Sequence, residues 1–309
     1  MKKILLASTA LVLSAGLAHA QAVTITGSGR MGITGMDAGG GWNWSQEHRL
    51  DLNFNVSVEA DHGLTFGAWT RARMEGGWQG VGLVSGNARG VGGFSTSRVW
   101  VEANGLRLTF GNIDGAIIRA GVAMGYAGGC GVGYIGGHLC GDSVGLLAVS
   151  QAQNSRAFTG AGALQNPALT GRHRTSLEYN WGSSRVTLSH DRDLNTTELG
   201  ARTTFNAFTV AVGLIDNGTS DWTLSGRYNG GSWSVGAIVA DVLNNSNWAL
   251  NGTVALGGGS LYAYVGETFN NDAYGISYGY GLGGGATLTA GWETVGNVDT
   301  ASIGVAFNF

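Results

Sequence analysis

The sequence predicts an all-β fold, a 16-stranded antiparallel transmembrane β-barrel. Three observations lead to this prediction: polar and apolar residues alternate with a period of two, charged residues are scarce, and the chain begins with an export signal. The stretch RLDLNFNVSVEAD at 49–61 shows the alternation without a break from Arg49 to Glu59. Successive side chains of a strand point to opposite faces, so one face of this strand is polar and the other is apolar.

Composition separates a membrane barrel from a soluble sheet. Only 12% of the 309 residues are charged, whereas a soluble domain carries about 25%. The chain holds 56 Gly and one Pro, and beyond residue 20 it has no apolar run of about 18 residues, so a membrane span has to be built from strands. The alternation by itself leaves open a soluble or adhesive β-sandwich with no pore.

The first residues predict the compartment. Residues 1–20 combine two lysines, an apolar run and the small-x-small site Ala18-His19-Ala20, which is typical of a secretory signal peptide. We therefore expect residues 21–309 to form a single transmembrane barrel domain. This part holds 15 Arg, because both lysines lie in the signal, against 20 acids, so nothing in it predicts nucleic-acid binding.

The strands follow one another almost without interruption. Their lengths suit tilted strands that cross a bilayer, and sixteen is an even number, as single-chain bacterial barrels require. The predicted strands are 22–35, 46–60, 63–75, 94–104, 105–112, 172–181, 184–193, 196–206, 207–216, 220–229, 232–242, 246–256, 259–269, 272–281, 285–295 and 299–309.

Alternation also predicts which side chains face inward. In GLTFGAWTRARME at 63–75, Phe66 and Met74 fall on the outward face, and Trp69, Arg71 and Arg73 fall on the inward face. An arginine on the lipid face costs roughly 2–4 kcal/mol at the midplane, so the arginines are expected to line a lumen. The same parity applies to Arg30, Arg49, Arg98 and Arg107.

Aromatic residues gather near strand ends or on the outward parity, for example Tyr179, Trp181, Trp222 and Tyr228. Such rings suit the headgroup level of a membrane and predict aromatic belts around the barrel.

A long loop at 112–171 interrupts the strands. Loops of this length are usually functional, and inside a barrel the lumen is one place for it. The exported chain's only cysteines, Cys130 and Cys140, lie in this loop and are expected to form a disulfide. A metal site of both cysteines and His138 is the weaker alternative, because it lacks a fourth ligand.

Two short motifs in the loop suggest an enzyme. GVGYIG at 131–136 matches a dinucleotide-binding pattern, and GDSVG at 141–145 matches a nucleophile elbow with Ser143, for which His138 or His173 would be the base. Neither motif has the strand before it and the helix after it that the pattern needs. An outer-membrane barrel hydrolase using Ser143 remains the alternative function, and we expect no enzyme.

Several segments together resemble the general diffusion porins of Gram-negative bacteria, most closely those of phototrophic alphaproteobacteria (Rhodobacter type). They are VTITGSGRMGITG at 23–35, GLTFGAWTRARMEGG at 63–77, LTFGNIDGA at 108–116 and the ending SIGVAFNF at 302–309. The resemblance implies sixteen antiparallel strands, a loop after the fifth strand that folds inward as a constriction, and a homotrimer in which the Gly-rich segment 76–93 reaches a neighbouring subunit. It also implies a Gram-negative outer-membrane location, with lipid and lipopolysaccharide outside and small hydrophilic solutes inside.

The resemblance also implies the site. Arginines on the wall face acids on the loop, and Phe309 resembles the terminal residue of the outer-membrane assembly signal. The loop holds only Asp114 and Asp142 as acids, so it does not support the family's calcium site, and we expect no cofactor and no metal. The implied function is a passive, water-filled channel for small hydrophilic solutes. The residues leave its ion preference open: the net charge of about −5 suggests cations, whereas the arginines with few acids on the loop suggest anions, to which we lean slightly at the narrowest point. The expected constriction residues are Arg30, Arg71, Arg73, Arg98, Asp114, Arg119 and Asp142.

Overall fold

The computed structural model describes residues 22–76, 93–95, 97–123, 173–216 and 218–309. This part of the chain is almost entirely sheet, and two short helices, η1 (Asp61–Gly63) and η2 (Ile117–Gly121), complete it. No helix among these residues is long and apolar enough to cross a membrane. The strands are β1 (Ala22–Asp37), β2 (Asn43–Glu59), β3 (Thr65–Gly76), β4 (Gly93–Phe94), β5 (Arg98–Ala103), β6 (Leu106–Gly111), β7 (Arg174–Trp181), β8 (Ser184–Asp191), β9 (Thr196–Phe205), β10 (Phe208–Asp216), β11 (Ser220–Asn229), β12 (Trp233–Val242), β13 (Asn245–Leu256), β14 (Gly259–Thr268), β15 (Asn271–Gly283), β16 (Ala286–Val295) and β17 (Val298–Asn308).

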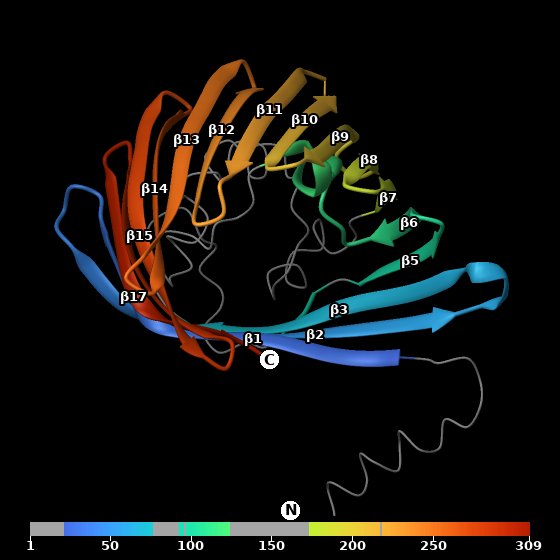
Figure 1. Cartoon of the computed structure of the whole chain (residues 1–309), viewed down its shortest axis with the longest axis horizontal. Coiled ribbons are helices and arrows are strands. Elements are labelled where there is room, and N and C mark those ends of the chain that lie inside the picture. The colour runs from blue at the N-terminus through green and yellow to red at the C-terminus, as the bar shows by residue number, and fades with distance from the viewer. Residues whose placement is uncertain (1–21, 77–92, 96, 124–172, 217) are drawn as a thin grey trace, which may run out of the picture.

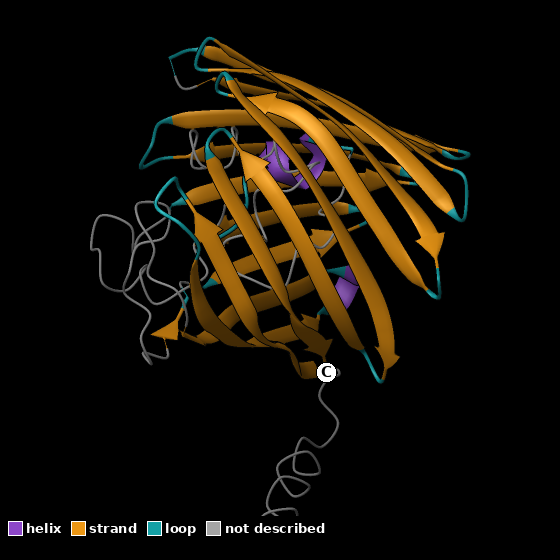
Figure 2. Ribbon diagram, turned by 90° about the vertical axis from the view of Figure 1, so that its left-hand side faces the viewer, coloured by secondary structure: helices purple, strands orange, loops and turns teal. Residues whose placement is uncertain are grey.

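The strands form one closed antiparallel barrel. Each strand pairs with its neighbours in chain order, and β1 pairs with both β2 and β17, which closes the sheet. Strands β4 and β5 both pair with β3, at different heights, so they occupy one position in the wall. The wall therefore has sixteen positions, and Figures 1 and 2 show it from two directions. The predicted 16-stranded antiparallel barrel is confirmed, with strand ends that differ from the predicted ones by a few residues.

The seam between β1 and β17 depends on glycine. Phe309 and Gly27 exchange two backbone hydrogen bonds, of 2.8 and 3.0 Å. A Cβ atom at Gly27 would collide with the ring of Phe309, and one at Gly29 would collide with the ring of Phe307. The rings thus lie over the two glycines, an arrangement that is known to stabilise glycine in sheets. We call the end of the barrel where β1 begins and β17 ends the termini end.

Tight turns join the strands from β7 to β17 at both ends of the barrel. Asn104 and Gly105 (φ 50° and 79°), between β5 and β6, have the left-handed conformation that two-residue hairpins need. Leu243 and Phe269 adopt positive φ as well, at 54° and 47°, although neither residue type favours it. The short turns leave little chain at either end of this part of the wall, so the long segments fall between β3 and β4 and between β6 and β7.

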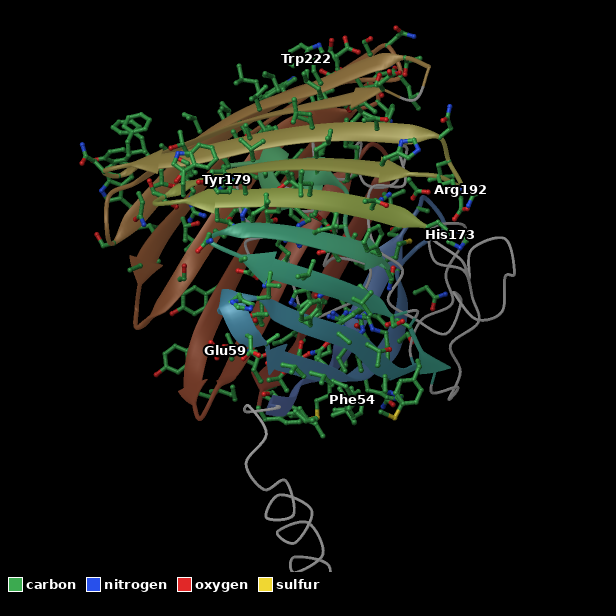
Figure 3. All side chains as sticks on the ribbon, turned by 90° about the vertical axis from the view of Figure 1, so that its right-hand side faces the viewer. Phe54, Glu59, His173, Tyr179, Arg192 and Trp222 are labelled. Atoms are coloured by element: carbon green, nitrogen blue, oxygen red, sulfur yellow. The ribbon has the colours of Figure 1, made fainter. Side chains whose placement is uncertain are left out.

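The outer surface carries the predicted apolar face and aromatic rings. Leu224 on β11 and Val239 on β12 are examples of large apolar side chains that are 52% and 42% exposed. Tyr179 stacks on Trp181 with ring centroids 5.3 Å apart, and Figure 3 shows Tyr179 and Trp222 on the outside of the wall. A soluble protein rarely exposes so many large apolar side chains, so this surface fits a lipid environment.

Candidate functional site

The inner face of β1, β2, β3 and β5 carries the predicted arginines. On β3, Trp69 is only 6% exposed whereas Phe66 is 47% exposed, so the tryptophan faces inward and the phenylalanine outward. Arg71 and Arg73 share the parity of Trp69, and Arg98 on β5 pairs in register with it. The alternation thus placed these side chains on the correct face.

Two of these arginines have an acid as partner. Arg30 on β1 forms an ion pair with Glu47 at 2.5 Å. Arg73 donates two hydrogen bonds to Asp51, at 2.6 and 2.8 Å. Sequence reasoning missed both acids as partners, although both lie on the strand next to the arginine they bind, on its inward parity.

Arg71 and Arg98 have neutral hydrogen-bond acceptors instead. Arg71 donates to the side-chain oxygen of Asn53 at 2.8 Å, and Arg98 is 3.4 Å from the backbone oxygen of Asn112. Both guanidinium groups also contact the Trp69 ring, with Arg98 4.0 Å and Arg71 5.3 Å from its centroid. A guanidinium over an indole face is held by a cation–π attraction that leaves its positive charge in place.

The start of the long loop folds into the barrel. Residues 112–123, including η2, lie against the inner faces of β8–β11, where Figure 1 shows the short helix inside the ring. The backbone N–H of Ala116 donates to Ser189 Oγ at 2.8 Å, and that of Ile117 donates to Glu198 at 3.0 Å. At the far end of this segment, Ala123 N–H donates to Ser225 Oγ at 2.7 Å. The predicted inward fold is therefore present in this first part of the loop.

Charged side chains fix the same segment to the wall. Arg119 on η2 donates two hydrogen bonds to Glu178 on β7, at 2.5 and 2.8 Å. Arg174 on β7 is fully buried, forms an ion pair with Asp191 at 3.0 Å and donates to the backbone oxygen of Ile113 at 2.8 Å. Residues 112–123 are thus held at both ends and in the middle.

Asp114 is the acid of this segment that acts on the arginine wall. Its carboxylate interacts electrostatically with both Arg71 and Arg98. Arg98 also feels the positive charge of Arg119. Asp114 and Arg119 therefore lie where the wall arginines and the inward segment face each other.

The remaining predicted residues of the loop fall outside the described part of the chain. These are Asp142, Cys130, Cys140, His138 and Ser143. His173, the other suggested base, is described and is exposed near the end of the barrel opposite the termini end, 3.1 Å from Asp193 (Figure 3). Within the described ranges, no group of three His, Cys, Asp or Glu side chains could hold a metal ion.

Part of the inner face is apolar, which the alternation did not predict. Ile215 on β10, Ile238 and Val242 on β12, and Ala273 on β15 belong to a buried cluster that also includes Ile117 of the inward segment. The signal was present in β12, whose inward positions 236, 238, 240 and 242 are all apolar. Part of the lumen wall, on the inner faces of β10, β12 and β15, is thus apolar.

A closed barrel with an apolar exterior, a charged inner wall and an inward segment is the architecture of a membrane channel. The family model described as "Gram-negative porin" matches residues 7–300. The chain belongs to this family and is an outer-membrane porin, a channel for passive diffusion.

Solved structures support the same fold. Two variants of the Rhodopseudomonas blastica porin align over 93% of this chain and 100% of theirs, with TM-scores of 0.74 and 0.72 and identities of 20% and 21%. A triple variant of the same porin gives a TM-score of 0.73. Comparison with curated proteins gives no match. The family and the fold fit a Rhodobacter-type porin in the outer membrane, and nothing in them supports a hydrolase.

Proposed function

We propose that this channel is water-filled, passes small hydrophilic solutes and ions without a chemical step, and prefers anions at its narrowest zone. The zone is defined by the described residues of the predicted constriction: Arg30, Arg71, Arg73, Arg98, Asp114 and Arg119. The observation that carries the anion preference is the difference between the two pairs of wall arginines. Arg30 and Arg73 each form an ion pair with an acid, whereas Arg71 and Arg98 donate to neutral acceptors. Two carboxylates act on Arg71 from further away: that of Asp51, which is already paired with Arg73, and that of Asp114, which also acts on Arg98.

The residual positive charge acts on permeating ions through water. A unit charge at a distance of about 6 Å, after screening at physiological salt, changes the local concentration of a monovalent ion by about twofold. Arg71 and Arg98 together therefore favour anions by a few fold over cations at this height of the lumen. Bulk net charge, which is negative, does not decide the preference because most acids lie elsewhere.

Reversal potentials in a planar bilayer test this proposal. In a potassium chloride gradient, the reversal potential of the porin should lie between zero and the equilibrium potential of chloride. Arg71→Gln and Arg98→Gln should each move the reversal potential towards the equilibrium potential of potassium, while Arg192→Gln should leave it unchanged. Arg192 lies in the exposed turn after β8, so its variant loses the same charge outside the lumen (Figure 3). A wild-type channel selective for potassium would contradict the proposed preference.

The assembly is part of the same proposal. Family membership supports a homotrimer embedded in the outer membrane of a Gram-negative bacterium, surrounded by lipid and lipopolysaccharide. The exposed apolar exterior is consistent with such surroundings. An unheated gel in SDS should show a band at three times the mass of the heated chain. The Cys130–Cys140 disulfide remains a prediction, which mass spectrometry with and without reductant would test.

A further inference from the structure

Three arginines lie together on a different part of the inner wall. They are Arg185 on β8, Arg202 on β9 and Arg227 on β11, all on the inward parity. Arg185 and Arg202 are direct cross-strand partners. The position of Arg202 corresponds in register to Ala211 on β10 and Ser225 on β11, and Arg227 is the next inward residue on β11 towards the termini end.

The arrangement brings like charges together. Side chains directly opposite each other on one face of a sheet have Cβ atoms about 5 Å apart, and equal charges in such a pair are destabilising. The charges that act on Arg202 are those of Arg185 and Arg227, both positive. A cluster of this kind becomes favourable when an anion lies between the guanidinium groups.

Acids of the protein do not fill this role. We consider the inner face of β7–β12 between the height of Glu178 in the wall and the termini end of the barrel. Among the described residues, Glu178 is the only acid in this area. Its carboxylate is occupied by two hydrogen bonds from Arg119 and by one from Asn180, and it lies 3.7 Å from Arg185. Arg119 and Arg185 thus share one carboxylate, and the charges of Arg202 and Arg227 remain without a neutralising acid within the described ranges.

The cluster retains donors that can bind a ligand. Arg185 is 42% exposed at its side chain, although its Nε donates to Asn180 Oδ1 at 2.7 Å and one Nη lies 3.4 Å from the backbone oxygen of Arg119. Arg227 donates to Ser234 Oγ at 3.1 Å, which uses one nitrogen of its guanidinium. For Arg202, no described residue offers an acceptor within hydrogen-bonding distance. Each guanidinium carries five N–H donors in a planar fork that matches the oxygens of a phosphate group or carboxylate.

We infer that Arg185, Arg202 and Arg227 form a binding site for a small multivalent oxoanion, separate from the arginines of β1–β5. The inference rests on the proposed function in one respect, since the anion has to reach the site through a water-filled lumen. Three guanidinium groups favour a divalent tetrahedral anion over chloride, because it can accept hydrogen bonds from more than one of them at once. Inorganic phosphate is therefore the probe.

The experiment measures the single-channel current carried by a fixed concentration of chloride. Phosphate replaces a second salt, one without chloride, so that the ionic strength stays constant. In the wild type, phosphate should reduce the current in a saturable way. Arg202→Gln should raise the phosphate concentration for half-maximal effect about tenfold, the loss expected for one charge-assisted hydrogen bond. Arg227→Gln should act in the same direction and is a second variant in case Arg202→Gln does not assemble.

Two controls separate this site from general electrostatics. Arg192→Gln removes one positive charge from an exposed turn and should leave the phosphate effect unchanged. Arg71→Gln should alter the reversal potential in potassium chloride but not the phosphate effect. If Arg192→Gln or Arg71→Gln weakened the phosphate effect as much as Arg202→Gln, a distinct site would be disproved.

The outcomes also separate this inference from the proposed function. A wild-type channel that conducts chloride selectively but shows no saturable response to phosphate would overturn the oxoanion site and leave the anion-preferring channel intact. A porin that inserts but prefers potassium would overturn the proposed preference, while a saturable phosphate effect in it would still support the site.

Discussion

At Gly200 the backbone of the inward segment lies close against the barrel wall. It lies on the inner face of β9, opposite Gly213 on β10. A Cβ atom at Gly200 would collide with the carbonyl oxygen of Ala116 and would lie 2.7 Å from the amide nitrogen of Gly121. Real Cβ atoms essentially never come within 3.0 Å of such neighbours, and the Ala116 oxygen would lie at 2.3 Å, so in Gly200→Ala the segment has to move by about 0.7 Å at that contact.

The cost of this movement follows from the contacts beside it. The wall cannot yield easily, because β9 is paired on both sides, so the strain falls on the segment. The hydrogen bonds from Ala116 to Ser189 and from Ile117 to Glu198 lengthen or break, and the second has a charged acceptor. Overpacking costs about 1–3 kcal/mol and a hydrogen bond to a charged group about 1.5–3 kcal/mol, so we expect a local loss of about 2 kcal/mol.

Hydrogen exchange followed by mass spectrometry measures this loss in the assembled protein. A local loss of about 2 kcal/mol should speed exchange in the peptide covering 112–123 by roughly thirtyfold. Gly279→Ala is the matched control: Gly279 also faces inward, and the nearest atom to its Cβ would be a Thr287 methyl at 3.7 Å. If the peptide covering 112–123 exchanged at the same rate in both variants and in the wild type, the absence of a side chain at Gly200 would not be what lets the segment pack against the wall.

Three further predictions concern the seam, a turn and the arginine wall. Deleting Phe309 removes two backbone hydrogen bonds and the ring over Gly27, so heat-modifiable folded barrel should fall several-fold in membranes; normal levels would contradict its role in assembly. The hydrogen bond with the His173 side chain holds the pKa of Asp193 below its ordinary value of 3.8, so this contact stabilises the turn above that pH and is lost as the pH falls through the lowered pKa. His173→Ala should therefore raise the pKa of Asp193 in a carboxyl NMR titration, and an unchanged value would argue against the contact. Asn53→Asp should neutralise Arg71 and shift the reversal potential towards potassium, whereas an unshifted potential would show that Arg71 does not set the selectivity.

Strand order and facing were predictable from the sequence because both depend on local chemistry. A period of two is enough to tell lipid-facing from lumen-facing side chains, and the side chains of β3 illustrate it: Trp69 and Arg71 inside, Phe66 outside. The turn Asn104-Gly105 carries its own conformational preference. The count of sixteen then followed from marking the alternating stretches along the chain.

The contacts of the inward segment were not predictable in the same way. Glu198 and Ser189 are ordinary inward-facing polar residues in the sequence, and only the folded chain shows that they accept hydrogen bonds from the backbone of residues 116 and 117. Gly200 and Gly213 likewise look like two of many glycines. Their role depends on a segment about 80 residues away in sequence, and alternation contains no information at that distance.

Cross-strand register explains why parity alone could not predict the charge of the lumen. Asp51 lies directly opposite Arg73, and Asn53 lies directly opposite Arg71. A shift of two residues between β2 and β3 would keep every side chain on its face. It would nevertheless place Asp51 opposite Arg71, so that Arg71 would be neutralised in place of Arg73. The same logic holds at the second cluster, where register sets Arg185 against Arg202 and no acid. The proposed anion preference therefore depends on which inward residues meet across neighbouring strands. Substitutions that exchange partners at fixed composition should change selectivity more than substitutions that change net charge outside the lumen.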